Sequence, residues 1–451
     1  MFQALFEWLR RKPRSVTRGD SDDLDLHAPL QDGRTASSSG EGTSSTLLCR
    51  EALLGRDERV AAYRFVLRES TRNRIRRSSR VVHHVYAEVI TGSLLQADVS
   101  RLLGNRAAIV ELPDTFLGHD SVRHLPPHNT VLALERIDGE PLPDPATLLP
   151  QIRTLRTLGY RIALHARGEH DIPPHLRQDI DVVLVDSAGS DPDKVRGLFA
   201  MLAREARGAA VAALNLDSLE DFRFFHSLGA TWFHGPFITR REKWALRELD
   251  TDIANARPLL DALRGDADNE HVIMLLKRNA AIALRMLRHA NAPVSGLPHE
   301  VESIEDALQL IGRKQLARWV MMALLTQHAG EGRAPAAMEA ALIRARMMEL
   351  LGRQSDRDGE TLFLVGLLSL ADVIMQVEMR SALDALAVSG EIRSAVLDGT
   401  GPHASLLELA VAWEHGDTAR IGDASARCGL NTEAAAEAYM QALWWALDVN
   451  P

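Results

Sequence analysis

Short apolar runs alternate with longer amphipathic runs between residues 46 and 241, and this alternation limits the fold more than any other feature of the chain. The short runs are rich in Val, Ile and Ala and occupy residues 107–112, 130–137, 160–165, 181–186, 209–216 and 231–238. The runs between them have helical spacing and include residues 81–103, 146–158, 192–207 and 219–228. Alternating strands and helices predict a parallel sheet with helices outside it, and seven or eight strands close most economically into a TIM-like barrel.

The segment that precedes this alternation, residues 49–68, predicts a β-hairpin with a polar turn from Gly55 to Glu58. Its layout resembles the opening hairpin of the EAL family, barrel phosphodiesterases that linearise cyclic di-GMP. Tyr63 and Arg68 set the register of the resemblance, and Arg64 stands where the family has a metal-binding Glu. In that register Glu51 is an ordinary residue of the first strand.

The resemblance implies a two-metal hydrolytic site, which needs several oxygen ligands at the ends of the strands. The residues that it places at the family's site positions in this chain are Arg64, Glu111, Leu132, Glu135, His165, Ala166, Leu184, Asp186, Leu214, Asp217 and His234. Aliphatic side chains, histidines and an arginine replace most of the family's acids, its Lys and its Gln. The resemblance therefore implies a degenerate EAL domain with no catalytic residue, no bound metal and no cofactor.

Three alternatives concern the charged residues that are left. Arg64 would oppose a metal ion and instead pair with Glu111, Asp186 or Asp217. His165 and His234 would ligate a transition metal together with Asp217 or Glu111.

In the third alternative, cyclic di-GMP binds without being hydrolysed, because Arg68 is retained and a guanidinium binds a phosphate in a bidentate manner. Glu135 and Asp186 are the other candidate nucleotide contacts.

The second half of the chain, residues 242–451, has no strand pattern. Apolar residues recur at helical spacing in residues 270–289, 303–327, 335–353, 362–375 and 432–447, which predicts an all-α domain. The segments that resemble an HDOD domain are residues 275–279, 287–291, 301–308, 311–316 and 366–372. Together the two halves resemble bacterial EAL–HDOD signalling proteins.

A metal hydrolase of the related HD type would need adjacent His and Asp residues. No His in the helical half is followed by Asp, so the sequence excludes that activity there. The polar residues have structural interpretations: Asn291 ends a helix, Ser303 caps the next one with Asp306 at position N3, and Gly312 allows a close turn. The Met pairs at residues 321–322 and 347–348 are expected to fill the core.

Composition and charge narrow the function further. Apolar residues make up 46% of the chain and the net charge is -9, so nucleic acid is not an expected partner. Two cysteines cannot build a disulfide scaffold, and no membrane-spanning run or signal peptide is evident, so a cytoplasmic location is expected.

The N-terminus is expected to be an amphipathic helix over residues 1–14, followed by a disordered tether over residues 15–45. The helix would contact a membrane surface peripherally, or pack on this protein or on a partner. The whole pattern predicts a non-catalytic signalling adaptor that binds protein partners through its helical domain. A cyclic di-GMP receptor and a residual metal-dependent phosphodiesterase are the alternatives.

Overall fold

A computed structural model describes residues 48–67, 71, 75–76, 78–96, 103, 106–137, 144–206, 208–241, 251–291, 301, 303–328 and 332–449. The predictions for residues 1–14 and 15–45 therefore lie outside the described residues. The predicted boundary at residues 241 and 242 adjoins a segment, residues 242–250, that is also outside them.

The chain opens with the predicted β-hairpin. Strands β1 (Leu48–Leu54) and β2 (Val60–Leu67) pair antiparallel, and the amide of Gly55 donates to the carbonyl oxygen of Arg59 across the turn at 2.7 Å. The pairing places Glu51 directly opposite Arg64. Side chains of directly opposed residues share one face of the sheet, so this register brings an acid and a base together.

Eight strands close into a barrel in sequential order. The remaining strands are β3 (Ala107–Pro113), β4 (Thr130–Glu135), β5 (Arg161–His165), β6 (Val182–Asp186), β7 (Ala210–Leu214) and β8 (Trp232–Phe233). Neighbours from β2 to β8 pair in parallel, whereas β1 is antiparallel to both β2 and β8. All carboxyl ends of the parallel strands therefore meet at one end of the barrel, which we call the mouth.

Helices cover the outside of the barrel. They are α3 (Arg80–Gln96), α5 (Pro145–Thr157), α6 (Pro192–Glu205) and α7 (Leu219–Leu228). Asp144, Asp191 and Ser218 cap the last three through side-chain oxygens that accept a backbone amide. Of the helix predicted over residues 81–103, α3 covers the part up to Gln96 and Leu103 is helical, while residues 97–102 lie outside the described residues. Between β3 and β4 the described residues form only short 3₁₀ turns.

Strand side chains alternate between two apolar layers. The inner layer fills the barrel with residues of every strand, among them Leu53, Ile109, Leu184 and Leu214. The outer layer joins the strands to the surrounding helices. The barrel is thus packed with apolar side chains below its mouth.

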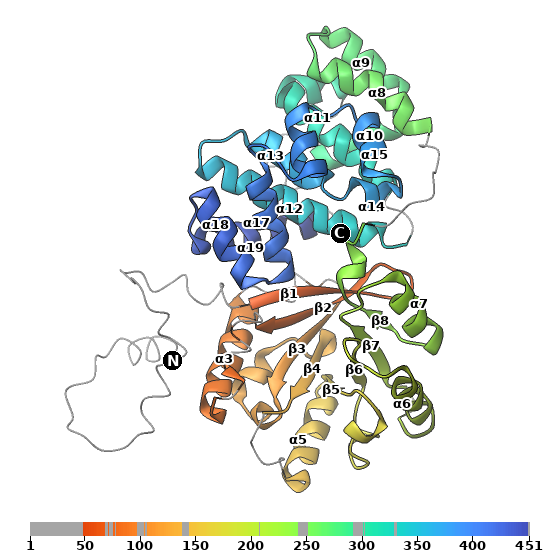
Figure 1. Cartoon of the computed structure of the whole chain (residues 1–451), viewed down its shortest axis with the longest axis vertical. Helices are drawn as coiled ribbons and strands as arrows, with labels where there is room; N and C mark the ends of the chain where they lie inside the picture. Colours follow the sequence, from red (N-terminus) through yellow and green to blue (C-terminus); the bar gives the residue numbers. More distant parts are fainter. Residues whose placement is uncertain are drawn as a thin grey trace, which may run out of the picture.

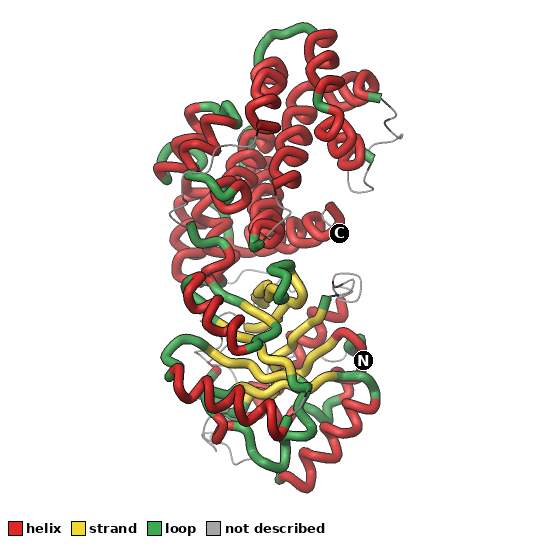
Figure 2. Tube along the Cα trace, turned by 90° about the vertical axis from the view of Figure 1, so that its right-hand side faces the viewer, coloured by secondary structure: helices red, strands yellow, loops and turns green. Residues whose placement is uncertain are grey.

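The second half of the chain is helical, as predicted. Its elements are α8 (Thr251–Arg264), α9 (Asn269–Arg278), α10 (Ala280–Ala290), α11 (Ile304–His328), α12 (Ala334–Gln354), α13 (Gly359–Leu368), α14 (Ala371–Met375), α15 (Met379–Ala385), α16 (Gly390–Arg393), α17 (Ala404–His415), α18 (Thr418–Cys428) and α19 (Thr432–Val449). Figures 1 and 2 show these helices stacked on one end of the barrel, with the strands enclosed by helices below. No helix among the described residues is both long and apolar enough to cross a membrane.

Several local predictions for the helical half are confirmed. Asn291 follows the last residue of α10, and the Ser303 hydroxyl accepts the Asp306 amide at 3.0 Å. Gly312 has a φ of 72° at a kink within α11, a conformation that favours glycine. The four methionines at residues 321–322 and 347–348 are buried in the core. The predicted helix over residues 270–289 is wrong in one respect, because Asn279 separates it into α9 and α10.

Candidate functional site at the barrel mouth

Polar side chains gather where the inward-facing residues of the strands reach the mouth. Two residues beyond the apolar inner layer, the strands present Arg64, Glu111, Glu135, His165, Asp186 and His234. The two-residue period of a strand dictates this placement, since each of these residues follows an inner-layer residue by two positions. Glu51 joins them from β1, opposite Arg64.

Arg64 lies at the centre of this group and holds two carboxylates. Its Nε and Nη2 donate to Glu111 Oε1 at 2.8 and 2.5 Å, and its Nη1 donates to Glu51 Oε2 at 2.6 Å. The side chains of Arg64 and Glu111 are each only 6% exposed. Burial opposes the charge of the guanidinium, but Glu111 and Glu51 outweigh it and raise the pKa of Arg64 above its ordinary value.

The two histidines of the mouth lie beside different acids. His165 Nε2 is 3.1 Å from Glu111 Oε1, whereas His234 Nε2 is 3.8 Å from Glu51 Oε2. Burial lowers the pKa of His234; the charges of Arg64 and His415 lower it further, and those of Glu51 and Asp186 oppose them. His234 is therefore held toward its neutral form.

Asn215 supplies a further polar group that the sequence did not indicate. It follows β7 with a φ of 56°, and its amide nitrogen donates to Asp186 Oδ1 at 2.9 Å. Asn adopts this left-handed conformation more readily than most residues. Gly235, next to His234, has a φ of 151°, and a Cβ there would lie 2.3 Å from the Leu216 backbone. Only glycine fits at that corner of the mouth.

A cavity of about 890 Å³ lies between the mouth and the helical region. The barrel contributes Glu51, Glu111, Glu135, Asp186 and His234 to its wall. Helices α12 and α19 and the end of α17 contribute Glu339, Tyr439, Glu414 and His415. The candidate site is thus shared by the two halves of the chain.

The structure differs from the expectation at several predicted site positions. Leu132 and Ala166 face the outer layer, since each alternates with inward-facing neighbours, and neither can supply a mouth ligand. Leu184 and Leu214 point inward but belong to the packed layer below the mouth. Asp217 is exposed and its carbonyl oxygen accepts a hydrogen bond from Arg240, so it is not part of the cavity wall. Arg68 lies outside the described residues.

Of the three acids expected as alternative partners of Arg64, Glu111 is the one that binds it. Asp186 instead accepts a hydrogen bond from Asn215, and Asp217 lies outside the cavity wall.

Glu51, interpreted from the sequence as an ordinary strand residue, is the second partner of Arg64. The hairpin itself indicates that the two strands lie side by side, but a turn over residues 55–59 alone would set Glu51 opposite Tyr63. The β-bulge between Leu53 and Leu54 shifts the register by one residue and brings Glu51 opposite Arg64. No comparable signal in the sequence identifies Glu339 or Glu414, which reach the mouth from the other half of the chain.

Arg64 engages the acids nearest to it at the centre of the mouth. The Glu111 and Glu51 oxygens that face the centre accept hydrogen bonds from Arg64, whose charge would repel a cation. Among the described residues, no group of three His, Cys, Asp or Glu side chains could hold a metal ion. In the alternative with His165 and His234 as metal ligands, Asp217 lies outside the cavity wall, whereas Glu111 lies 3.1 Å from His165.

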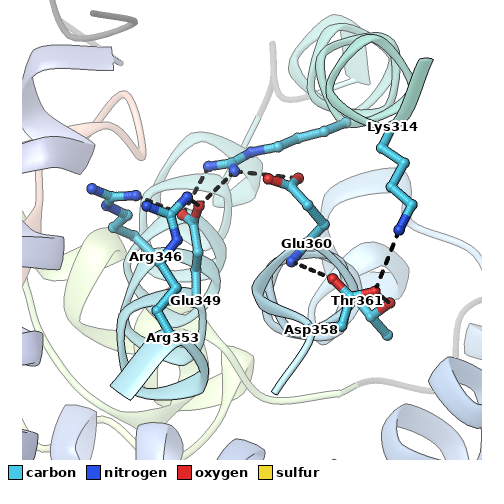
Figure 3. Close-up of polar contacts among 8 residues, drawn as sticks. Lys314, Arg346, Glu349, Arg353, Asp358, Glu360 and Thr361 are labelled. Carbon is cyan, nitrogen blue, oxygen red and sulfur yellow. Dashed lines mark hydrogen bonds and ion pairs between the residues drawn. The ribbon is translucent and has the colours of Figure 1, made fainter. Parts of the chain in front are cut away.

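A second polar cluster lies inside the helical region. Glu349 is fully buried and receives hydrogen bonds from Arg318, Arg346 and Arg353 (Figure 3). The Arg318 guanidinium also lies over the Phe363 ring, 3.3 Å from its centroid. Burial raises the pKa of Glu349, but the hydrogen bonds and charges of Arg318 and Arg346 outweigh it and bring that pKa below its ordinary value. This cluster ties α11, α12 and α13 together.

Comparisons with known proteins agree with this architecture. Residues 263–397 match the HDOD domain family. The chain is 22% identical over 407 residues to YuxH, an uncharacterized protein of Bacillus subtilis, covering 88% of this chain and 97% of YuxH. It is 20% identical over 416 residues to the cyclic di-GMP phosphodiesterase CdgJ of Vibrio cholerae, covering 90% of this chain and 93% of CdgJ.

Solved structures with similar parts include a phosphodiesterase and an EAL enzyme. The PaMucR phosphodiesterase in its c-di-GMP complex is 17% identical, with a TM-score of 0.36, over 42% of this chain and 93% of that chain. The EAL enzyme Bd1971 in its cAMP-bound form is 18% identical, with a TM-score of 0.35, over 42% of this chain and 60% of that chain. The predicted fold class, an EAL-like barrel followed by an HDOD-type helical region, is confirmed. The protein is related to CdgJ and YuxH along most of its length.

Proposed function

We propose that this protein is a non-catalytic signalling adaptor in a bacterial cyclic di-GMP-linked pathway. Its relative CdgJ is a cyclic di-GMP phosphodiesterase, which supports the link to that nucleotide. In this proposal the barrel is a degenerate phosphodiesterase domain that does not hydrolyse the nucleotide, and the helical region binds a protein partner.

The ion pairs of Arg64 are the observation that carries the proposal. A guanidinium and a unit charge about 4 Å apart interact by about 4 kcal/mol at an effective dielectric near 20, and a divalent cation at the same place would be repelled by roughly twice that. Glu111 and Glu51, the acids nearest Arg64, are already engaged by it. The protein's own cation thus offsets the charge of these acids, which supports a barrel without metal-dependent chemistry.

A hydrolysis assay tests the catalytic half of the proposal. The full chain is incubated with cyclic di-GMP and Mg²⁺ or Mn²⁺, and linear product is quantified. We expect no turnover above that of a heat-denatured sample. Turnover that is lost in Asp186→Asn, a variant at the cavity wall, would establish a phosphodiesterase instead.

The cavity favours one alternative, a receptor that binds cyclic di-GMP without hydrolysis. Its volume of about 890 Å³ suits a small molecule, and exposed Arg136 on its wall is able to contact a phosphate. Calorimetric titration with cyclic di-GMP distinguishes the two functions. The adaptor proposal predicts no heat of binding at high micromolar nucleotide, whereas saturable heat that Arg136→Ala weakens would support the receptor.

The helical region has its own apolar core, formed entirely by residues between Ala256 and Ala446. This supports a unit that binds a partner without help from the barrel. A pull-down that compares the full chain with residues 242–451 tests the idea. Capture of the same protein by both forms supports the assignment, and capture by the full chain alone would contradict it.

A further inference from the structure

A buried carboxylate of the helical region contacts the barrel beside the mouth. Glu339 of α12 accepts hydrogen bonds at Oε1 from the Tyr63 hydroxyl, at 2.7 Å, and from Arg50 Nη2, at 3.0 Å. Arg106 Nη1 is 3.5 Å from Glu339 Oε2 and also donates to the Tyr63 hydroxyl. One helix thus reaches three side chains of the barrel.

These groups depend on one another because they are buried. The side chains of Arg50 and Glu339 are 8% and 4% exposed. The Arg50 guanidinium lies 4.1 Å from the centroid of the Tyr63 ring, and its Nε and Nη1 have no hydrogen-bond partner among the described residues. Glu339 is therefore the acid that directly offsets the charge of Arg50, and its loss would leave a buried cation uncompensated.

Polar contacts continue around the rim of the mouth. Arg344 binds Glu414 with Nε and Nη2 at 2.6 and 3.1 Å. Burial raises the pKa of Glu414, but Arg344, His415 and the Thr239 side chain of the barrel outweigh it and lower that pKa. Arg333, at the start of α12, donates to the carbonyl oxygen of Phe237. The end of α17 and the start of α12 are thereby held over the cavity.

Apolar packing contributes little to this contact. The core of the helical region contains no barrel residue, and Ala336 is the one helical-region member of the barrel's outer layer among the described residues. Two units with separate cores and a polar interface resemble domains that move relative to each other. Such a contact is suited to opening and closing.

We propose that the helical region is a lid on the barrel mouth and that Glu339 is the latch that keeps it closed. In the closed arrangement the cavity is bounded by both halves of the chain. Figure 1 shows α17 and α19 above β1 and β2. Release of Glu339 frees the helical region to separate and opens the cavity to solvent. A role of this lid in signalling rests on the proposed function, whereas the contact between Glu339 and the barrel does not.

Hydrogen exchange measured by mass spectrometry on the full chain tests the latch. In Glu339→Gln we expect amide exchange to rise at least tenfold in β1 and in residues 232–239, while α5 and α13, which lie away from the interface, keep their wild-type rates. Small-angle scattering should show a larger radius of gyration. The control Glu408→Gln breaks an exposed pair with Arg427 inside the helical region and should change neither measurement.

Unchanged exchange at the mouth, or an equal rise in α13, would overturn the latch. If Glu339→Gln does not fold, Tyr63→Phe tests the latch in its place, because this variant keeps the aromatic ring and removes one hydrogen bond to Glu339. It should raise exchange at the same two segments by a smaller factor, and no rise there would refute the proposal. Neither measurement involves nucleotide or partner, so a failed latch leaves the assays of the proposed function intact.

Discussion

Replacing Arg64 by Gln removes the positive charge at the centre of the mouth while keeping a polar side chain of similar length. Two carboxylates, Glu51 and Glu111, then face each other without the guanidinium that lies 2.6 Å from one and 2.5 Å from the other. Removing one partner of a buried ion pair costs about 3–5 kcal/mol. For a domain of this size each kcal/mol lowers Tm by about 2–4 °C, so we expect the barrel transition to fall by roughly 6–20 °C.

Differential scanning calorimetry of the full chain measures this change. The matched control is Arg427→Gln, which breaks a pair with Glu408 whose side chains are 50% and 40% exposed, and exposed pairs contribute about 1 kcal/mol or less. The deficit of Arg64→Gln should shrink as the pH falls toward 5, because the uncompensated carboxyls then take up protons. A Tm drop no larger than that of the control would refute the reasoning, since Arg64 would then not balance buried acids.

Further predictions concern the helical region. Glu349→Gln should lower stability by about 3–5 kcal/mol in urea unfolding, because buried Arg318 then loses the carboxylate that binds both of its terminal nitrogens and keeps, among the carboxylates of the described residues, only the contact with Glu360 at 3.5 Å. A loss below about 1 kcal/mol would contradict this. The pKa of Glu349 lies below its ordinary value of 4.5, so the stabilisation by its carboxylate is complete above that pH and is lost as the pH falls through the folded-state pKa. Glu349→Gln should therefore unfold with a weaker dependence on acid than wild type. An acid-unfolding midpoint equal to that of wild type would argue against this role of Glu349. Gly366→Ala should lower the stability measured by thermal unfolding by about 1–3 kcal/mol, because the added Cβ would lie 2.4 Å from the Ala345 backbone nitrogen. The control Gly422→Ala, whose Cβ would have nothing within 4 Å, should not destabilise the protein, and equal effects of the two variants would disprove close packing at Gly366.

Most of the fold was predictable because each element carries its own periodic pattern. Helix α7 (Leu219–Leu228) matches its prediction to the residue, helped by the Ser218 cap and by Gly229 at its end. The break between α9 and α10 was missed, because Asn279 interrupts a pattern whose apolar spacing continues on both sides. Strand β8 was predicted too long, since its apolar residues go on into a 3₁₀ turn at Pro236–Ile238.

The candidate site was less predictable, for two physical reasons. Inward and outward directions on a strand alternate, so a motif placed by resemblance can name a residue on the wrong face, as it did for Leu132. Contacts between distant parts of the chain leave no local pattern, and Glu339 lies 289 residues from Arg50. The proximity of Glu51 and Arg64 was accessible from the sequence because both lie in one hairpin, although the β-bulge between Leu53 and Leu54 sets their register.

The most direct test of whether the guanidinium of Arg64 occupies the place of metal ions is a titration of Mn²⁺ into the full chain. Electron paramagnetic resonance measures the Mn²⁺ that stays unbound. The account predicts that all added Mn²⁺ stays in solution at micromolar concentrations, in wild type and in Asp186→Asn alike. Stoichiometric binding at those concentrations in wild type, abolished by Asp186→Asn, would contradict it.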